Sequence, residues 1–179
     1  MNHEFMINIT SDRETPRKAY ALVEDVLGWN YHYYLQRGCY EVEAGDIDLA
    51  KNFLDQARAM APDDYRVRTE WAYMTLKRAA SNAASVGAGN RAQEAFEELE
   101  DAIESRGRTD PRPYHILGSQ GLAWVRRAII GRDEQARLLS GLLYRVKEGI
   151  KHHPRQRDLR QLAEDIEREY LMTTVPDSN

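Results

Sequence analysis

The sequence predicts an all-α protein of about eight helices arranged as antiparallel pairs. Apolar residues recur along most of the chain at the three- to four-residue spacing of a helix face. Start and stop signals such as Gly45-Asp46 and Asp110-Pro111 separate these segments. With 11 Gly and 6 Pro in 179 residues, the chain has too few of either for long linkers or an all-β fold.

The first predicted helix spans about residues 16–28 and follows a flexible arm, residues 1–14. Thr15-Pro16 is typical of a helix cap followed by proline at the first helical position. Five apolar residues form one stripe along this helix: Ala19, Leu22, Val23, Val26 and Leu27. We expect the stripe to cover the exposed face of the helix pair that follows.

That pair occupies the segment from Tyr31 to Pro62. Gly45 is suited to the left-handed conformation that ends a helix, and Asp46 is suited to cap the next one. The second helix carries an apolar stripe: Leu49, Ala50, Phe53, Leu54 and Ala57. Gly38 is predicted to be a small position where the two helices approach closely.

Two longer helix pairs are predicted after Pro62. In the first, an alanine-rich stretch lengthens the leading helix, residues 87–89 form a turn, and Asn90 caps the helix that follows. In the second, helices of about 111–130 and 133–151 turn at Gly131, and Pro154 closes the pair. A closing helix of about 156–171 and a flexible tail, 172–179, complete the chain.

The segment from Tyr31 to Asp64 resembles the tetratricopeptide repeat. With Tyr31 counted as the first position, an aromatic residue (Tyr34) is fourth and Gly38 is eighth, as in that family's unit of roughly 34 residues. The two later pairs match this pattern only if about eleven or twelve residues are inserted. The resemblance implies that residues 15–171 form a short right-handed α-solenoid that binds a partner.

In that family the first helix of each pair lines a concave groove. The corresponding residues of this chain are His32, Gln36, Cys39, Glu43, Arg66, Glu70, Tyr73, Lys77, Arg112, His115 and Ser119. A mixed polar lining of this kind suits an extended peptide or a partner helix. We therefore predict a non-catalytic protein-interaction scaffold or adaptor, either free or as the sensing or docking part of a larger protein. Leu35 and Cys39 stand where arrays that grip a C-terminal carboxylate carry a cation and Asn, so that specificity is not expected.

The alternative function is nucleic-acid binding through a basic segment near the C-terminal end. Its six cations are Arg145, Lys147, Lys151, Arg155, Arg157 and Arg160. They are suited to contact phosphates or an acidic protein, or simply to complement the dipole of a solvated helix end. The acidic run 94–104 is expected to be a solvated face, and its charge is opposite to that of the basic segment. Copies of the chain with such segments are able to pair head to tail, which makes a homo-oligomer a further alternative.

Five aromatic residues gather near the start of the first pair: Trp29, Tyr31, Tyr33, Tyr34 and Tyr40. They are suited either to a peptide-binding or base-stacking surface or to the core between helices. The core interpretation is favoured because large aromatic rings fill inter-helical space while tyrosine hydroxyls reach water.

Composition and motifs exclude several other classes. The net charge of −4 gives no global reason to bind nucleic acid or an anionic membrane. A single cysteine excludes an internal disulfide and favours a reducing, cytoplasmic compartment. No apolar run reaches the roughly 20 residues of a membrane span, and no secretory signal is recognised. No catalytic or metal-binding motif is found, so we expect no enzymatic activity and no cofactor.

Overall fold

A computed structural model describes residues 14–174. The predicted flexible arm, apart from Glu14, and residues 175–179 of the predicted tail lie outside this range. The chain forms two compact units, one ending at Met74 and the other beginning at Thr75. Across the described residues there are eight α-helices and no strand, packed largely as sequential antiparallel pairs, which confirms the predicted all-α class.

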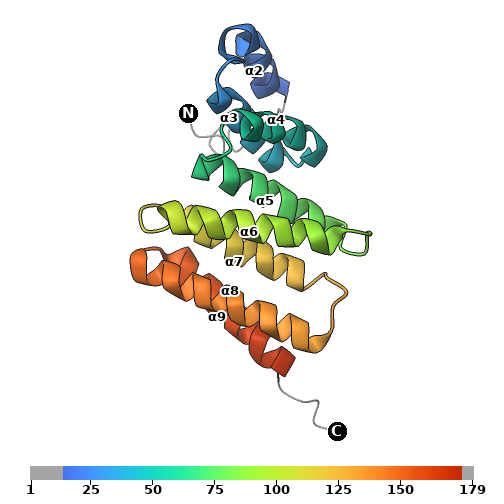
Figure 1. Ribbon diagram of the computed structural model, residues 1–179, viewed down its shortest axis with the longest axis vertical. Coiled ribbons are helices and arrows are strands. Elements are labelled where there is room, and N and C mark those ends of the chain that lie inside the picture. Colours follow the sequence, from blue (N-terminus) through green and yellow to red (C-terminus); the bar gives the residue numbers. More distant parts are fainter. Residues whose placement is uncertain (1–13, 175–179) are drawn as a thin grey trace. The chain divides into compact units, whose positions relative to one another are not determined.

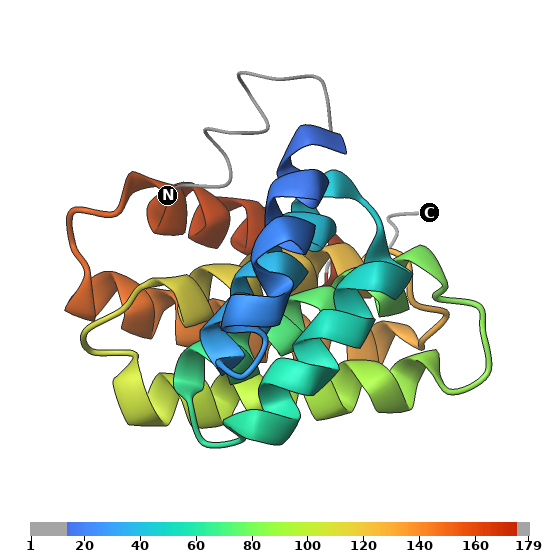
Figure 2. The same cartoon turned by 90° about the horizontal axis from the view of Figure 1, so that it is seen from above.

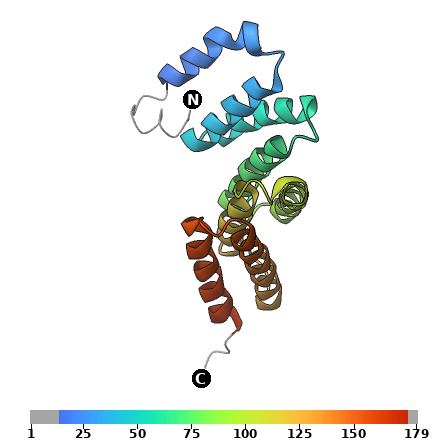
Figure 3. The same ribbon diagram turned by 90° about the vertical axis from the view of Figure 1, so that its left-hand side faces the viewer.

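The first unit contains three whole helices and the start of a fourth: α2 (Glu14–Leu27), α3 (Tyr31–Ala44), α4 (Ile47–Met60) and α5 (Tyr65–Ser81). Helices α3 and α4 run side by side in opposite directions (Figures 1 and 3). Their core is apolar and includes the first part of α5: Leu35, Val42, Ala50, Leu54, Ala57, Val67, Trp71 and Met74. Figure 2 shows this unit from above, where α2 is joined to α3 by a short connection.

Local sequence signals fixed most of the helix boundaries in this unit. Gly45 has φ of 84° and ends α3, and its backbone N–H donates to the Val42 carbonyl. The Asp46 carboxylate then accepts the Leu49 backbone N–H at 3.2 Å. Both predictions are confirmed, because a left-handed glycine and an aspartate N-cap depend only on their immediate neighbours.

Two predicted caps were wrong. Helix α2 begins at Glu14, so Thr15-Pro16 lies inside its first turn. The helix expected to start after Asn90 is α6 (Ala88–Arg106), and its N-cap is Gly87 with φ of 79°. Asn90 therefore occupies the first turn of α6. The glycine determines this boundary because a positive φ cannot continue into or out of a regular helix.

The second unit contains the end of α5 and four further helices: α6, α7 (Arg112–Val125), α8 (Arg132–His152) and α9 (Arg157–Thr174). Helix α7 packs against α6, α8 and α9, and α8 pairs with α9 (Figure 1). The helix predicted over 111–130 is therefore too long, since α7 ends at Val125. The additional length of this pair lies in α8 and in the turn of residues 126–131. Helix α9 continues three residues beyond the predicted 171.

The close approach of helices predicted at Gly38 is confirmed, and the structure shows a second one at Gly118. A Cβ atom placed on Gly38 would lie 2.5 Å from Cγ of Leu54 on α4. A Cβ atom on Gly118 of α7 would lie 2.6 Å from a methyl of Val146 on α8 and 2.6 Å from one of Leu162 on α9. Neither position tolerates a side chain without movement of its neighbours.

Candidate partner-binding cleft

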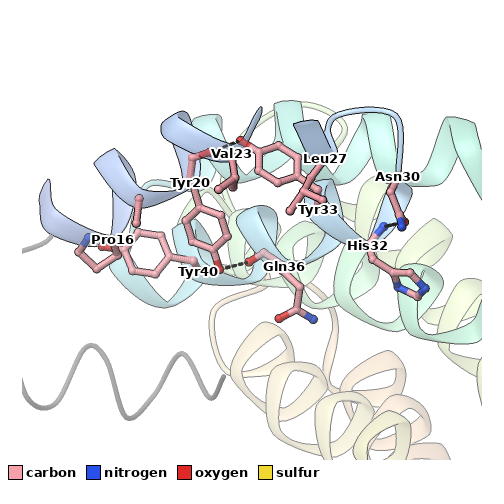
Figure 4. Close-up of a pocket in the computed structure, with 10 residues that line it drawn as sticks. Pro16, Tyr20, Val23, Leu27, Asn30, His32, Tyr33, Gln36 and Tyr40 are labelled. Carbon is pink, nitrogen blue, oxygen red and sulfur yellow. Dashed lines mark hydrogen bonds between the residues drawn. The ribbon is translucent and has the colours of Figure 1, made fainter. Parts of the chain in front are cut away.

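Helices α2 and α3 enclose an apolar cleft of about 460 Å³ in the first unit (Figure 4). Its lining comes from one face of each helix and the connection between them: Pro16, Ala19, Tyr20, Val23, Leu27, Asn30, His32, Tyr33, Gln36 and Tyr40. Apolar side chains and tyrosine rings supply most of the walls, while Asn30, His32 and Gln36 supply polar atoms. A concave apolar site with a few polar groups is the usual form of a binding pocket.

The cleft exists because the apolar stripe of α2 is broader than its contact with α3. Pro16 is the one residue of α2 that is buried. Farther along the helix, Leu22 is 83% exposed and Val26 is 66% exposed. The stripe was predicted to cover the pair that follows. The structure shows that α2 contacts α3, as expected, but leaves much of its apolar face open.

The N-terminal end of α2 is held by an ion-pair network. The guanidinium of Arg17 donates two hydrogen bonds to Oε2 of Glu41, at 2.6 and 3.1 Å, and one to Asp46 at 3.1 Å. Glu41 is fully buried and also pairs with Arg37 at 3.1 Å. Arg37 donates to the backbone carbonyl of Arg17 at 2.9 Å. Hydrogen bonding to Glu41, above all, raises the pKa of Arg17.

Tyrosine rings form the wall between this network and the cleft. The Arg37 guanidinium carbon lies 5.1 Å from the centroid of the Tyr20 ring, within cation–π range. Burial raises the pKa of Tyr20 to about 12. The Tyr20 ring meets the Tyr33 ring edge-on, with centroids 6.1 Å apart. Tyr33 and Tyr40 are buried, whereas Trp29 is 74% exposed.

The five aromatic residues near the start of the first pair therefore do not share one environment. The core interpretation holds for Tyr33 and Tyr40, and Tyr31 and Tyr34 pack half-buried against the core of the first unit. Trp29 remains at the surface, in the connection from α2 to α3.

Of the four groove residues predicted on α3, two line the cleft and two do not. His32 and Gln36 line the cleft. Glu43 is exposed, and Cys39 is half-buried against the core. The cleft thus takes one wall from the predicted groove face and the other from α2, to which no site residue was assigned. The apolar stripe of α2 was recognised in the sequence, but it was assigned to covering the next helix pair and not to a binding site.

On α5, the predicted groove residues serve packing and local bonding. Arg66 is exposed and donates to both carboxylate oxygens of Asp64, at 3.1 and 2.7 Å, and to the Tyr31 hydroxyl at 3.1 Å. Glu70 is buried, so it does not face an open groove, and Tyr73 packs half-buried against the core. Lys77 is half-buried and lies in the second unit.

The Asp64 carboxylate joins Tyr31 and Arg66 through hydrogen bonds that depend on its negative charge. Removing that charge is expected to lower the stability of the first unit. Hydrogen bonds from Arg66 and Tyr31 hold the pKa of Asp64 well below its usual value. A depressed folded-state pKa adds stability above pH about 4 and loses it as the pH falls further. Asp64→Asn is therefore expected to lower the free energy of unfolding by about 1 kcal/mol at pH 7. In urea titrations, this loss in the free energy of unfolding should be smaller below pH 4 than at pH 7. An equal loss under the two conditions would contradict a role for the charge of Asp64.

The last three predicted groove residues belong to α7 in the second unit. Arg112 and His115 border a small hollow of about 190 Å³ beside Asp158 and Leu159. Ser119, one turn further along α7, is half-buried. This hollow is less than half the volume of the α2–α3 cleft and holds no extended apolar surface.

Ion pairs occupy part of the predicted basic segment. Arg145 pairs with Glu100 on α6 and with Glu148 one turn away. Lys147 pairs with Glu167 on α9 at 3.0 Å. Arg160 donates to the Pro154 carbonyl. Three exposed cations of this segment, Lys151, Arg155 and Arg157, form no ion pair within residues 14–174. The acidic and basic segments thus form ion pairs within one chain. Fewer of their charges are left to pair copies of the chain head to tail.

The described residues hold neither a metal-binding cluster nor a membrane-spanning helix. Among residues 14–174, no group of three or more His, Cys, Asp or Glu side chains is arranged to hold a metal ion. No helix in the same range has the length and apolar character needed to cross a bilayer. Comparison with protein-family models, with curated proteins and with solved structures finds no match to this chain.

Proposed function

We propose that this chain is a non-catalytic protein-interaction module that binds an apolar segment of a partner in the α2–α3 cleft. The observation that carries the proposal is the open apolar cleft of about 460 Å³ beside a helix whose apolar residues remain exposed. Solvated apolar surface of this kind is costly in isolation and marks interaction sites.

The shape and polarity of the cleft favour a helix as the bound segment. Its walls are two helices, and an amphipathic partner helix laid between them would bury apolar side chains at a spacing of three and four residues. His32 and Gln36 at the border offer hydrogen bonds to polar groups on the flank of that helix. Apolar contact supplies affinity in this arrangement, and the polar border restricts orientation.

We further propose that the helix pairs stack as a short right-handed solenoid like that of tetratricopeptide repeats. Gly38 meets Leu54 in the first pair, and Gly118 meets Val146 in the third. Counted from Pro111, Gly118 is eighth, as Gly38 is when counted from Tyr31. Val146 then corresponds to Leu54 once an insertion of about twelve residues is allowed for. Such arrays are recognition scaffolds, which is consistent with a binding role.

The proposal is tested by blocking the cleft with a charge. Val23 lines the cleft and is 38% exposed, so Val23→Arg adds a cation there without disturbing a packed core. Ala21→Arg makes the same chemical change at an exposed position of α2 that does not line the cleft. We expect a nuclease-resistant partner to co-purify with the wild type and with Ala21→Arg. Its recovery with Val23→Arg should fall at least about tenfold, as expected for loss of a central interface contact.

Two outcomes would overturn this assignment. Equal recovery by both arginine variants would place the binding surface elsewhere. Loss of all bound material after nuclease treatment, together with steep weakening by salt, would favour nucleic acid at Lys151, Arg155 and Arg157 instead.

A further inference from the structure

Helix α2 carries a second surface, next to the cleft, that we call the outer stripe: Lys18, Leu22, Asp25 and Val26. These residues recur at three- and four-residue intervals, so they share one face of the helix. All four are exposed, and Leu22 and Val26 are 83% and 66% exposed. The cleft is lined by Ala19, Val23 and Leu27, which lie around the helix from the outer stripe.

The charges of the outer stripe are self-complementary. Lys18 and Asp25 lie on the same edge of the stripe, two turns and about 10 Å apart along the helix axis. Neither forms an ion pair within residues 14–174. Lys18 lies four residues before Leu22 and Asp25 lies three residues after it, so this charge pair matches its own copy when that copy runs in the opposite direction.

We propose that two copies of this chain associate through the outer stripes of their α2 helices, antiparallel about a two-fold axis near Leu22. Two-fold symmetry places Lys18 of each copy opposite Asp25 of the other, which gives two equivalent ion pairs. The same rotation brings Leu22 and Val26 of both copies into one apolar seam. Isologous contacts of this kind are the commonest route to dimers, and flanking charges set the orientation of such helix pairs.

The test combines molecular mass with charge reversal on the full chain. Sedimentation equilibrium of the wild type should show a concentration-dependent mass that approaches twice 20.7 kDa. Lys18→Glu sets like charges opposite each other at both ends of the seam and should weaken the dimer about tenfold or more. The double variant Lys18→Glu/Asp25→Lys restores both pairs with reversed polarity and should recover the dissociation constant of the wild type. Lys151→Glu, the same charge change at an exposed site in the second unit, should leave the mass unchanged.

Leu22→Asp provides an independent check, because an 83% exposed side chain is replaced without loss of internal packing. This variant should remain monomeric at every concentration while its helical circular dichroism is unchanged. A wild type that stays monomeric throughout would overturn the proposal, as would a dimer that survives Leu22→Asp. A double charge variant no tighter than Lys18→Glu alone would overturn the antiparallel pairing.

These results are separable from those for the cleft. Val23→Arg tests the cleft through partner recovery, whereas Leu22→Asp tests the outer stripe through molecular mass. A failed dimer proposal therefore does not affect the test of the cleft by partner recovery. A failed cleft proposal does not affect the test of the dimer by molecular mass.

Discussion

Replacement of Glu41 by glutamine is expected to destabilise the first unit by about 3 kcal/mol. Glu41 is fully buried and accepts hydrogen bonds from Arg17, while Arg37, 9% exposed at its side chain, pairs with it at 3.1 Å. Glutamine keeps the shape of the side chain but removes its charge. Two guanidinium groups then share a poorly solvated space without their central counter-ion, and an unpaired charge is costly there.

The matched control is Glu43→Gln on the same helix. Glu43 is exposed, so the same chemical change should alter the free energy of unfolding by less than about 0.5 kcal/mol. Urea unfolding followed by circular dichroism at pH 7 measures both variants. Equal midpoints for the two variants would show that the network contributes nothing to stability.

Arg17 connects this network to the cleft, because it is the residue of α2 that pairs with Glu41. In Glu41→Gln, α2 should therefore loosen before the α3–α4 pair does. Hydrogen–deuterium exchange is expected to rise in residues 14–27 under conditions where α4 remains protected. The cleft depends on the position of α2, so recovery of a cleft-bound partner should fall as well.

The sequence indicated the helices well because their signals are local. Gly45 and Asp46 define a helix end and a helix start through neighbouring backbone atoms, and both acted as predicted. Asn90 failed as a cap because Gly87, three residues earlier, already adopts a positive φ and starts α6. Gly87 and Asn90 were both able to mark the start of this helix, and the sequence did not show which of the two would do so.

The candidate site was harder to predict because it depends on how two helices are set against each other. His32 and Gln36 were assigned to a groove from their place in a repeating unit, and they do line the cleft. Glu70 was assigned in the same way but is buried. The spacing of residues identifies a helix face, whereas the exposure of that face depends on neighbours distant in sequence. The ion pairs of Arg145 with Glu100, from separate helices, are long-range effects of the same kind.

A leucine at Gly118 is expected to cost about 3 kcal/mol in the second unit. The first carbon of the new side chain would already lie 2.6 Å from both Val146 and Leu162, on two different helices. Because α8 and α9 also pack on each other, neither can withdraw without opening their shared interface. The cost therefore appears as overpacking strain, and α7 should separate from one of its neighbours.

Gly141→Leu is the control, with an identical side chain added at a helical glycine of the same unit. A Cβ atom there meets nothing within 4 Å, so the gain in helix propensity should stabilise α8 by up to about 0.8 kcal/mol. Gly38→Leu should resemble Gly118→Leu, because its Cβ would lie 2.5 Å from Leu54. Thermal and urea unfolding of the three variants gives the comparison. If both Gly38→Leu and Gly118→Leu unfolded like the wild type, the close approach at these corresponding places would be refuted, and with it the proposed repeat register.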